Sequence, residues 1–481
     1  YLCDGPIHLE SNIDFHLSKD SEIRFGSNYS DYLPAVLTRW EGTRVYGYSP
    51  FVYAFQKTNV ALTGTGTLDG QAKETWAKWT DGHDADKELN REMNQTRVPL
   101  EERQFGEGRK LRPPMIQFYE CENILVEEVR IIDSPFWCVH TVFSRNITVR
   151  NITFTAMNPN NDGIDIDSCE DVYIHDVIFA NHDDNVVIKS GRDTEGRDLG
   201  IPTRNVYVRD CVFNAYTGVA IGSEMSGSIY NIFVEDCHAE SMCKRGLNIK
   251  GNRDRGGEVA HIRFRNIQFE DVSREMFVMS GDYGGENDNN FPPYYHDIRW
   301  EDCSGTGSCR IGLKLTGQAD LPIENVVLKN ISVDKAEVNS VIEHVDGLIT
   351  QKVRMVDQHL VNFENLPPDV YAGPDQVVSG INASVLLEGT VADDGATGVP
   401  MTYQWSVIQG DARSVKFDAV ESLKTTASFT AEGLYVLKLT ANDSELDGYH
   451  FLIVEVGKNA GGIAAVTKPI FQHSGTHPGY Q

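Results

Sequence analysis

The chain has 481 residues, a net charge of −27 and 40% hydrophobic residues. It is too long for one compact domain, its composition is globular, and no window approaches the roughly 20 apolar residues of a membrane span. The acidic balance argues against a nucleic-acid partner, because binding phosphate requires clustered Lys and Arg. Residues 189–255 differ, with ten Lys and Arg against nine Asp and Glu. This contrast suits a site for an acidic ligand, or it is chance on a solubilising surface.

The amino-terminal residues 1–17, YLCDGPIHLESNIDFHL, alternate as a strand does and show neither the charged nor the apolar region of a signal peptide. We expect them to be the middle of a β-repeat, with the original N-terminus processed or missing. The nine cysteines show no CxxC metal spacing. Those within strand-like segments, such as Cys121 and Cys211, are expected to be buried free thiols.

One alternating phrase, of the type NITVRNITF, recurs along the first 330 residues. Its copies begin at Asn12, Asn59, Asn123, Asn146, Asp171, Asn205, Asn231, His261, Asp297 and Asn325. From Asn123 onward the steps are 23, 25, 34, 26, 30, 36 and 28 residues. Each copy alternates Ile, Val or Phe with polar residues, which is strand periodicity, and we find no helical pattern of useful length between the copies.

A second short strand recurs between these copies, at 163–168, 186–191, 219–224, 247–252, 277–281 and 313–317. Two or three short strands per turn of 22–36 residues predict an all-β fold, a parallel β-helix solenoid over residues 1–365. A propeller is the alternative, but its blades need about 40–45 residues each. The uneven steps predict loops of variable length on one side, where solenoids build their grooves.

Two features are expected to shape such a groove. Residues 81–125 form a long charged insertion between coils, and long loops on a rigid scaffold are usually functional or mobile. Blocking one end of the groove with this insertion would admit only the end of a polymeric ligand. Trp137 and Tyr283 are candidate platforms for stacking on the ring of a ligand, with burial under a loop as the alternative for each.

The sequence pattern changes after a Pro-Pro boundary near Leu366. Shorter alternating strands with turns every 8–12 residues predict a small Ig-like β-sandwich over 366–457, followed by a loosely ordered tail over 458–481. The phrases AGPDQ, TYQWS and GLYVLKLTANDSE resemble PKD-type modules. Such modules occur on exported bacterial carbohydrate enzymes, so the resemblance implies a secreted, periplasmic or cell-surface protein.

Stacking the second strands on their central Ile residues locates a candidate site. Equivalent positions on neighbouring coils lie about 4.8 Å apart. With Ile166, Ile188, Ile221 and Ile249 aligned, the positions four residues upstream are Asp162, Asp184, Thr217 and Arg245. Asp183 lies one residue before Asp184, and the positions one residue after the Ile column include Lys189 and Lys250. Three carboxylates are therefore predicted to meet in one groove, with cations on the coils around them.

Such a trio suits hydrolysis of a glycosidic bond in an acidic polysaccharide or oligosaccharide. One Asp, its pKa raised by the anions beside it, protonates the leaving oxygen, and the other two activate a water on the opposite face. Arg245 and Lys250 would bind the substrate carboxylate. Lys189 is either a further groove cation or a structural partner. The alternative for the aspartates is a purely structural role in capping turns, because NNDG and HDDN are typical turn sequences.

The ordered motifs NNDGIDIDS, HDDNVVIKSG, TGVAIGSEMSG and RGLNIKGNRDRGG resemble those of glycoside hydrolase family 28, the polygalacturonases, in its bacterial branch. The resemblance covers about residues 1–350. It implies a right-handed parallel β-helix that hydrolyses α-galacturonosidic linkages of pectin with inversion and without a metal or other cofactor. It also implies that Asp183 is the general acid, that Asp162 and Asp184 activate the water, and that Lys250 contacts the substrate carboxylate, with Asn160 in the same motif as Asp162.

Two positions depart from the family pattern. Thr217 stands where the family has a histidine that supports the acid, and Asn248 stands where it has an arginine. Arg245 is a candidate to replace the missing cation. These changes favour a side-chain or exo-acting enzyme over a plain homogalacturonan hydrolase.

Two other functions remain open from the sequence. A polysaccharide lyase on the same fold would cleave by β-elimination, usually with Ca²⁺, and would give an unsaturated product. A non-catalytic carbohydrate-binding solenoid would explain the lost histidine, although all three aspartates are retained.

Overall fold

The computed structural model describes residues 1–214, 216–241, 243–284, 290–362 and 365–457. The chain divides into two compact units, Tyr1–Asn362 and Phe363–Gln481. The tail expected over 458–481 lies outside the described residues. Within the described part, no helix combines the length and the apolar character that crossing a membrane requires.

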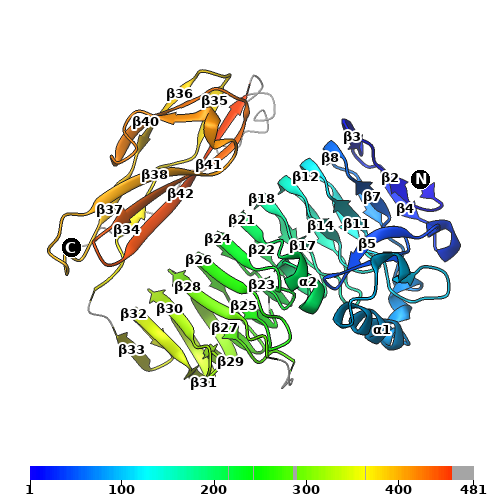
Figure 1. Ribbon diagram of the computed structural model, residues 1–481, viewed down its shortest axis with the longest axis horizontal. Helices are drawn as coiled ribbons and strands as arrows, with labels where there is room; N and C mark the ends of the chain where they lie inside the picture. Colours follow the sequence, from blue (N-terminus) through cyan, green and yellow to red (C-terminus); the bar gives the residue numbers. More distant parts are fainter. Residues whose placement is uncertain (215, 242, 285–289, 363–364, 458–481) are drawn as a thin grey trace. The chain divides into compact units, whose positions relative to one another are not determined.

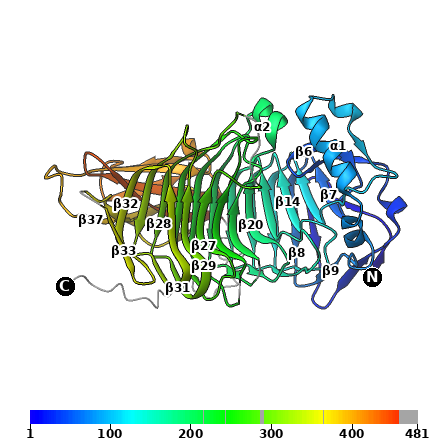
Figure 2. The same ribbon diagram turned by 90° about the horizontal axis from the view of Figure 1, so that it is seen from below.

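The first unit is a parallel β-helix, seen in Figures 1 and 2 as a stack of strands that runs leftward from the N-terminus. All pairings of its 30-stranded sheet are parallel except β32–β33. The strands of the first column are β2 (Ile7–His8), β7 (Val52–Phe55), β11 (Ile116–Tyr119), β14 (Val139–Val142), β17 (Ile164–Asp167), β20 (Asp184–Lys189), β23 (Thr217–Ile221), β25 (Arg245–Lys250) and β27 (Glu275–Ser280).

The other two columns complete each coil. The second comprises β3 (Ile13–His16), β8 (Thr58–Thr63), β12 (Glu122–Glu127), β15 (Arg145–Arg150), β18 (Glu170–His175), β21 (Thr203–Arg209), β24 (Ile229–His238), β26 (Glu258–Phe269), β28 (Tyr294–Glu301), β30 (Ile323–Lys329) and β32 (Val345–Met355). The third comprises β1 (Leu2–Cys3), β4 (Glu22–Phe25), β9 (Thr67–Asp69), β13 (Arg130–Ile132), β16 (Thr153–Thr155), β19 (Ile178–Phe179) and β22 (Val212–Phe213). Toward the C-terminal end, β29 (Ser304–Thr316) and β31 (Ser332–Glu343) continue the third column into the first, and β33 (Gln358–Asn362) follows.

A ladder of side-chain amides explains why the repeated phrase begins with Asn. Asn12, Asn59, Asn123 and Asn146 occupy left-handed backbone, with φ between 53° and 61°, and Asn tolerates this conformation better than most residues. The amides of Asn59, Asn123 and Asn146 each donate to the Asn one coil before, at 2.7–2.8 Å. The phrase predicted from sequence is therefore confirmed as the structural repeat, and Asn at its start both turns the chain and joins the coils.

The interior of the coils is apolar and contains an aromatic stack. Phe154 lies 5.2 Å from Phe179, with the rings nearly parallel. A Cβ at Gly163 would lie 2.6 Å from the Phe179 ring, closer than a side chain can approach. The residue after Asp162 must therefore be glycine, because the chain passes directly over the stack at this point.

A second ladder holds three aspartates in a row. Asp176, Asp210 and Asp236 occupy left-handed backbone on successive coils, and Asn266 donates to Asp236 at 2.6 Å. Burial raises the pKa of Asp210 to about 7, against the opposing effect of Arg209. Above that pH the folded protein must hold an ionised carboxylate in a partly dry site beside two like charges.

We expect Asp210→Asn to stabilise the protein by about 1–2 kcal/mol at pH 8 and to change stability much less at pH 4. The raised pKa sets this sign, because the cost of Asp210 is small below the pKa of about 3.9 of an unfolded Asp, grows as the unfolded carboxyl ionises, and is complete only above the folded pKa of about 7. Thermal unfolding at the two pH values measures the difference. Asp302→Asn, at an exposed position of the same ladder, is the matched control and should change stability by less than about 0.5 kcal/mol. An equal gain in stability at both pH values would refute the raised pKa of Asp210.

The insertion is more ordered than the sequence indicates. It contains α1 (Asp84–Gln95), and a small sheet of β5 (Val36–Trp40), β6 (Thr43–Gly47) and β10 (Gln104–Phe105) lies against it, with 3-10 turns η1 (Tyr29–Tyr32), η2 (Trp76–Thr80) and η3 (Leu100–Glu102). Helix α1 has no apolar pattern to predict it, because its buried residues are polar: Asp86, Asn90 and Asn94. Figures 1 and 2 show α1 and α2 (Asp193–Leu199) on the same side of the coils.

The second unit is a small β-sandwich, as expected. One sheet is ordered β35-β42-β41-β38 and another β36-β40-β39, with β34 paired to β37. Trp405 and Phe429 are fully buried in its core. The bounds are β34 (Asp369–Tyr371), β35 (Gln376–Ser379), β36 (Ser384–Glu388), β37 (Thr390–Ala392), β38 (Thr402–Gln409), η4 (Ala412–Ser414), β39 (Val415–Phe417), β40 (Lys424–Phe429), β41 (Gly433–Asn442) and β42 (Asp447–Gly457).

Candidate active site

The column predicted from sequence exists. Ile166, Ile188, Ile221 and Ile249 are in register on four coils. Asp184, Thr217 and Arg245 are in register at the entrance of their strands. The structure therefore brings the aspartates of neighbouring coils to the same edge of the sheet.

Asp184 is the ionised member of the trio. Its Oδ2 lies 2.7 Å from Nζ of Lys250, which comes from the end of a strand two coils further on. Burial alone would raise the pKa of Asp184, but Lys250 outweighs burial and the net shift is downward. A buried, ionised carboxylate held by one ammonium is suited to accept a proton.

The pKa of Asp183, which is half-buried at the same turn, shifts in the opposite direction. Burial and the adjacent Asp184 raise the pKa of Asp183 to about 6. Its Oδ1 accepts the backbone N–H of Asp184 at 3.0 Å. The amide of Asn181 fixes the turn by donating to the carbonyls of Asp183 and Asp184, at 2.9 and 3.1 Å. The turn therefore orients two adjacent carboxyl groups with opposite pKa shifts.

Asp162, expected to activate the water together with Asp184, completes the trio. It is 5% exposed, and burial, Asp165 and Asp183 raise its pKa well above the ordinary value. Asp165, which the sequence indicated to be structural, is fully buried, and neither of its carboxylate oxygens has a hydrogen-bond partner. A polar residue in the middle of an Ile-rich strand, in register with His140 and Val187, was the only signal for this second buried acid.

Lys189 and Trp137 contact each other beneath the trio and are not open groove residues. Nζ of Lys189 lies 3.0 Å from Glu224, 3.7 Å from Asp165 and 4.6 Å from the ring centre of Trp137. Lys189 and Trp137 are each 4% exposed. The structure thus favours the structural alternative for Lys189, and it gives Trp137 a cation rather than a sugar on its face.

Asn160 faces the insertion. Its Oδ1 accepts from Nη2 of the buried Arg112 at 2.7 Å, while Nη1 of Arg112 donates to the carbonyls of Pro135 and Pro159, at 3.0 and 2.7 Å. Arg112 thereby ties the insertion to the turn that carries Asp162. Sequence reasoning missed Arg112, because nothing in a loop sequence shows which turn it will contact.

The two departures from the family pattern lie beside Asp184 and Lys250. Thr217 is fully buried and in register with Asp184, but its hydroxyl has no hydrogen-bond partner among the described residues, so Lys250 is the group whose contact with Asp184 is established. Asn248 is 3% exposed and two residues before Lys250, so both project from the same face of β25. Arg245, expected to replace the missing cation, instead pairs with Glu275 at 2.7 Å.

Tyr283 keeps the properties of a sugar platform. It is 41% exposed, and its ring centre lies 5.2 Å from Nζ of Lys250. It is the exposed aromatic of the predicted set, and it contacts the cation that holds Asp184.

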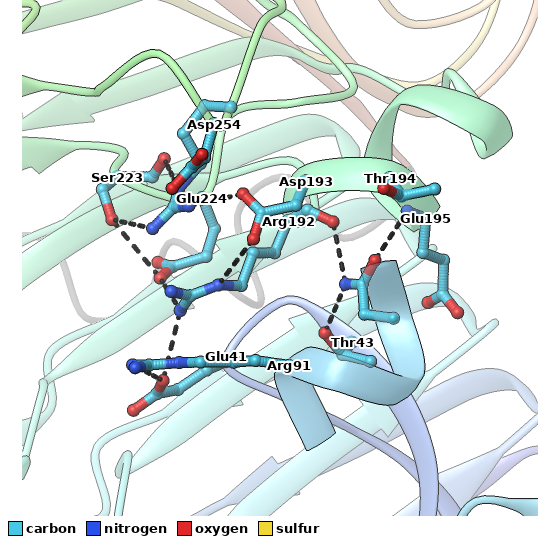
Figure 3. A network of polar contacts seen from close by, with 12 residues as sticks. Glu41, Thr43, Arg91, Arg192, Asp193, Thr194, Glu195, Ser223, Glu224 and Asp254 are labelled. Carbon is cyan, nitrogen blue, oxygen red and sulfur yellow. Dashed lines mark hydrogen bonds and ion pairs between the residues drawn. The ribbon is translucent and has the colours of Figure 1, made fainter. Parts of the chain in front are cut away.

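A buried ion network fixes the insertion against the site (Figure 3). Arg192 pairs with Glu41 at 3.2 Å and with Glu224 at 3.3 Å. Glu224 also pairs with Lys189, and Glu41 also pairs with Arg91 of α1 at 3.2 Å. Asn94 of α1 donates to Thr43 and to the carbonyl of Arg192, at 2.7 and 3.0 Å. The insertion is thus a fixed wall beside the trio on the coils preceding Asp162.

These groups can perform acid–base chemistry on one bond. A protonated carboxyl and an ionised carboxylate on adjacent residues, in a recessed site, supply a proton donor and a proton acceptor. Among the described residues, no group of three or more His, Cys, Asp and Glu is placed to hold a metal ion.

Fold and site together define a glycoside hydrolase built on a parallel β-helix. Residues 37–353 match glycosyl hydrolases family 28, and the chain belongs to that family. Residues 372–454 match a family of PKD domains, within the β-sandwich.

The similar proteins are polygalacturonases. A hyperthermoactive exopolygalacturonase from Thermotoga maritima is 35% identical, with a TM-score of 0.69 over 73% of this chain and 82% of that chain. A polygalacturonase from Erwinia carotovora ssp. carotovora is 25% identical, with a TM-score of 0.54 over 72% of this chain and 86% of that one. A probable polygalacturonase from Vitis vinifera is 28% identical over 351 residues, 69% of this chain and 65% of its own length, so this chain spans just under two thirds of that relative.

Proposed function

We propose that the protein is an inverting, exo-acting hydrolase of α-galacturonosidic linkages in pectin or a related uronic polysaccharide. The observation that carries this proposal is the opposite shift of two adjacent carboxyl pKa values, upward at Asp183 and downward at Asp184. Asp183 donates the proton to the leaving oxygen, and Asp184 takes a proton from the attacking water, which Asp162 orients. Family membership supports hydrolysis over β-elimination.

The proposal that the enzyme is exo-acting depends on the wall that the insertion forms beside the trio. Arg112 and the ion network of Figure 3 hold the insertion directly beside the turn of Asp162, so a polymer has no free path past the trio toward the N-terminal coils. The proposal therefore places a single sugar between the wall and the trio. The Thermotoga maritima relative is named an exopolygalacturonase, which supports the same mode of action. The PKD module supports an exported enzyme.

We expect incubation with homogalacturonan to release monogalacturonate from the first minutes, with the chain length of the remaining polymer falling slowly. Products resolved by anion-exchange chromatography, with proton NMR of the fresh anomer, measure both the exo mode and inversion. Early release of mixed oligomers would refute the exo assignment. Absorbance of an unsaturated product near 235 nm would refute hydrolysis.

A further inference from the structure

A row of basic residues continues the column that begins at the acid. Asp183, Tyr216, Lys244, Arg274 and Arg310 occupy the position just before the first-column strand on five consecutive coils. Backbone hydrogen bonds join the row: Lys244 N–H to the carbonyl of Tyr216, Arg274 N–H to that of Lys244 at 2.9 Å, and Arg310 N–H to that of Arg274 at 2.8 Å. These side chains therefore leave the solenoid from one edge, the edge that carries Asp183.

The row is a local excess of positive charge on an acidic protein. Arg274 and Arg310 are exposed and Lys244 is half-buried, with its ammonium on the ring and hydroxyl of Tyr216. In the neighbouring column, Arg245 and Glu275 pair at 2.7 Å.

From the coil of Tyr216 through the coil of Arg310, Glu275 is the one acidic residue in the two columns, and it is shared by Arg245 and Arg310. Four basic residues thus face a single carboxylate. Arg274 makes no ion pair within the described part of the chain. The excess occurs in a chain of net charge −27.

The repeat of the row matches a repeating anion. Successive members are about 4.8 Å apart, the spacing of neighbouring strands. A polyuronate likewise carries one carboxylate on every sugar, so an extended chain along the coils would place a carboxylate near each cation in turn. Arginine side chains suit this contact, because the planar guanidinium binds carboxylates bidentately. The row ends one coil further on, where the register places Glu337 after Arg310.

We propose that Lys244, Arg274 and Arg310 form a cationic track that binds the polyuronate chain on the leaving-group side of the scissile bond. This deepens the proposed function and rests on it. The track begins at the coil of Asp183, which protonates the leaving oxygen, and the wall of Arg112 occupies the opposite side of the trio. The terminal sugar therefore sits against the wall, and the remaining polymer extends over the track.

The test is the dependence of kcat/KM on chain length. In the full-length double variant Arg274→Gln/Arg310→Gln, we expect a loss of about tenfold on galacturonate oligomers of four or more residues and under about threefold on digalacturonate. The wild-type advantage on long oligomers should also shrink as salt rises, because exposed charges are screened. Arg145→Gln, in an exposed Arg–Glu pair off this row, is the matched control and should keep the wild-type dependence on chain length.

Equal losses on all chain lengths, or no loss, would overturn the track. Binding separates this failure from failure of the proposed function. Calorimetry with tetragalacturonate on Asp183→Asn protein, with and without the two arginine substitutions, reports on the track even if the wild type cleaves no galacturonide. Weaker binding in the triple variant supports the track, and unchanged binding refutes it.

Discussion

Replacing Asp183 with Asn is expected to lower kcat on galacturonate oligomers by about 10³-fold while binding of tetragalacturonate is retained. The amide has nearly the same shape and can still accept the backbone N–H of Asp184, but it cannot deliver a proton to a leaving oxygen. General acids contribute about 10²–10⁴-fold, so the expected loss lies in the middle of that range.

The pH dependence of kcat/KM is a second test of Asp183 as the general acid. With a pKa of about 6 at Asp183, wild-type kcat/KM should fall about tenfold per pH unit above pH 6, because the acid is then ionised. The residual activity of Asp183→Asn should not show this alkaline limb. Asp176→Asn, at the turn between β18 and β19, is the control and should keep both rate and profile. If Asp183→Asn keeps more than about a tenth of the wild-type activity, or shows the same alkaline limb, Asp183 is not the general acid.

How far the sequence predicts this molecule depends on which residues carry the signal. The coils could be predicted because Asn12, Asn59 and their equivalents repeat one physical task, turning the chain through left-handed backbone and bonding to the next coil. Register follows from that repeat. Alignment on Ile166 and Ile188 alone therefore placed Asp162 beside Asp184.

The partners of the charged residues could not be predicted in this way. Arg245 pairs with Glu275 and Lys189 with Glu224, across coils whose loops differ in length, and the repeat does not specify which side chains meet there. The burial of Trp137 follows from the insertion, whose folding is set by polar contacts such as Asn94 to Thr43 rather than by an apolar pattern.

Glu224 is a buried ionised residue whose loss should strongly destabilise the fold. It accepts from Lys189 at 3.0 Å and Arg192 at 3.3 Å in a site closed to solvent, with Arg255 close by, and these cations lower its pKa well below the ordinary value. Glu224→Gln keeps the volume but leaves the two cations without their shared anion. Breaking a buried ion pair on one side costs about 3–5 kcal/mol, far more than the same change at an exposed pair.

We therefore expect Glu224→Gln to lower the free energy of unfolding by about 3 kcal/mol at pH 7, measured by urea or thermal unfolding of the first unit's transition. Because the folded pKa is depressed, the stabilisation from Glu224 is complete above its unfolded pKa of about 4.3 and declines as the pH falls toward the folded value. The gap between wild type and variant should accordingly narrow below about pH 4. Glu122→Gln, which removes the exposed partner of Arg145, should cost less than about 1 kcal/mol. Equal costs for the two variants would mean that the network of Figure 3 does not hold the wall in place, and the exo assignment would lose its structural basis.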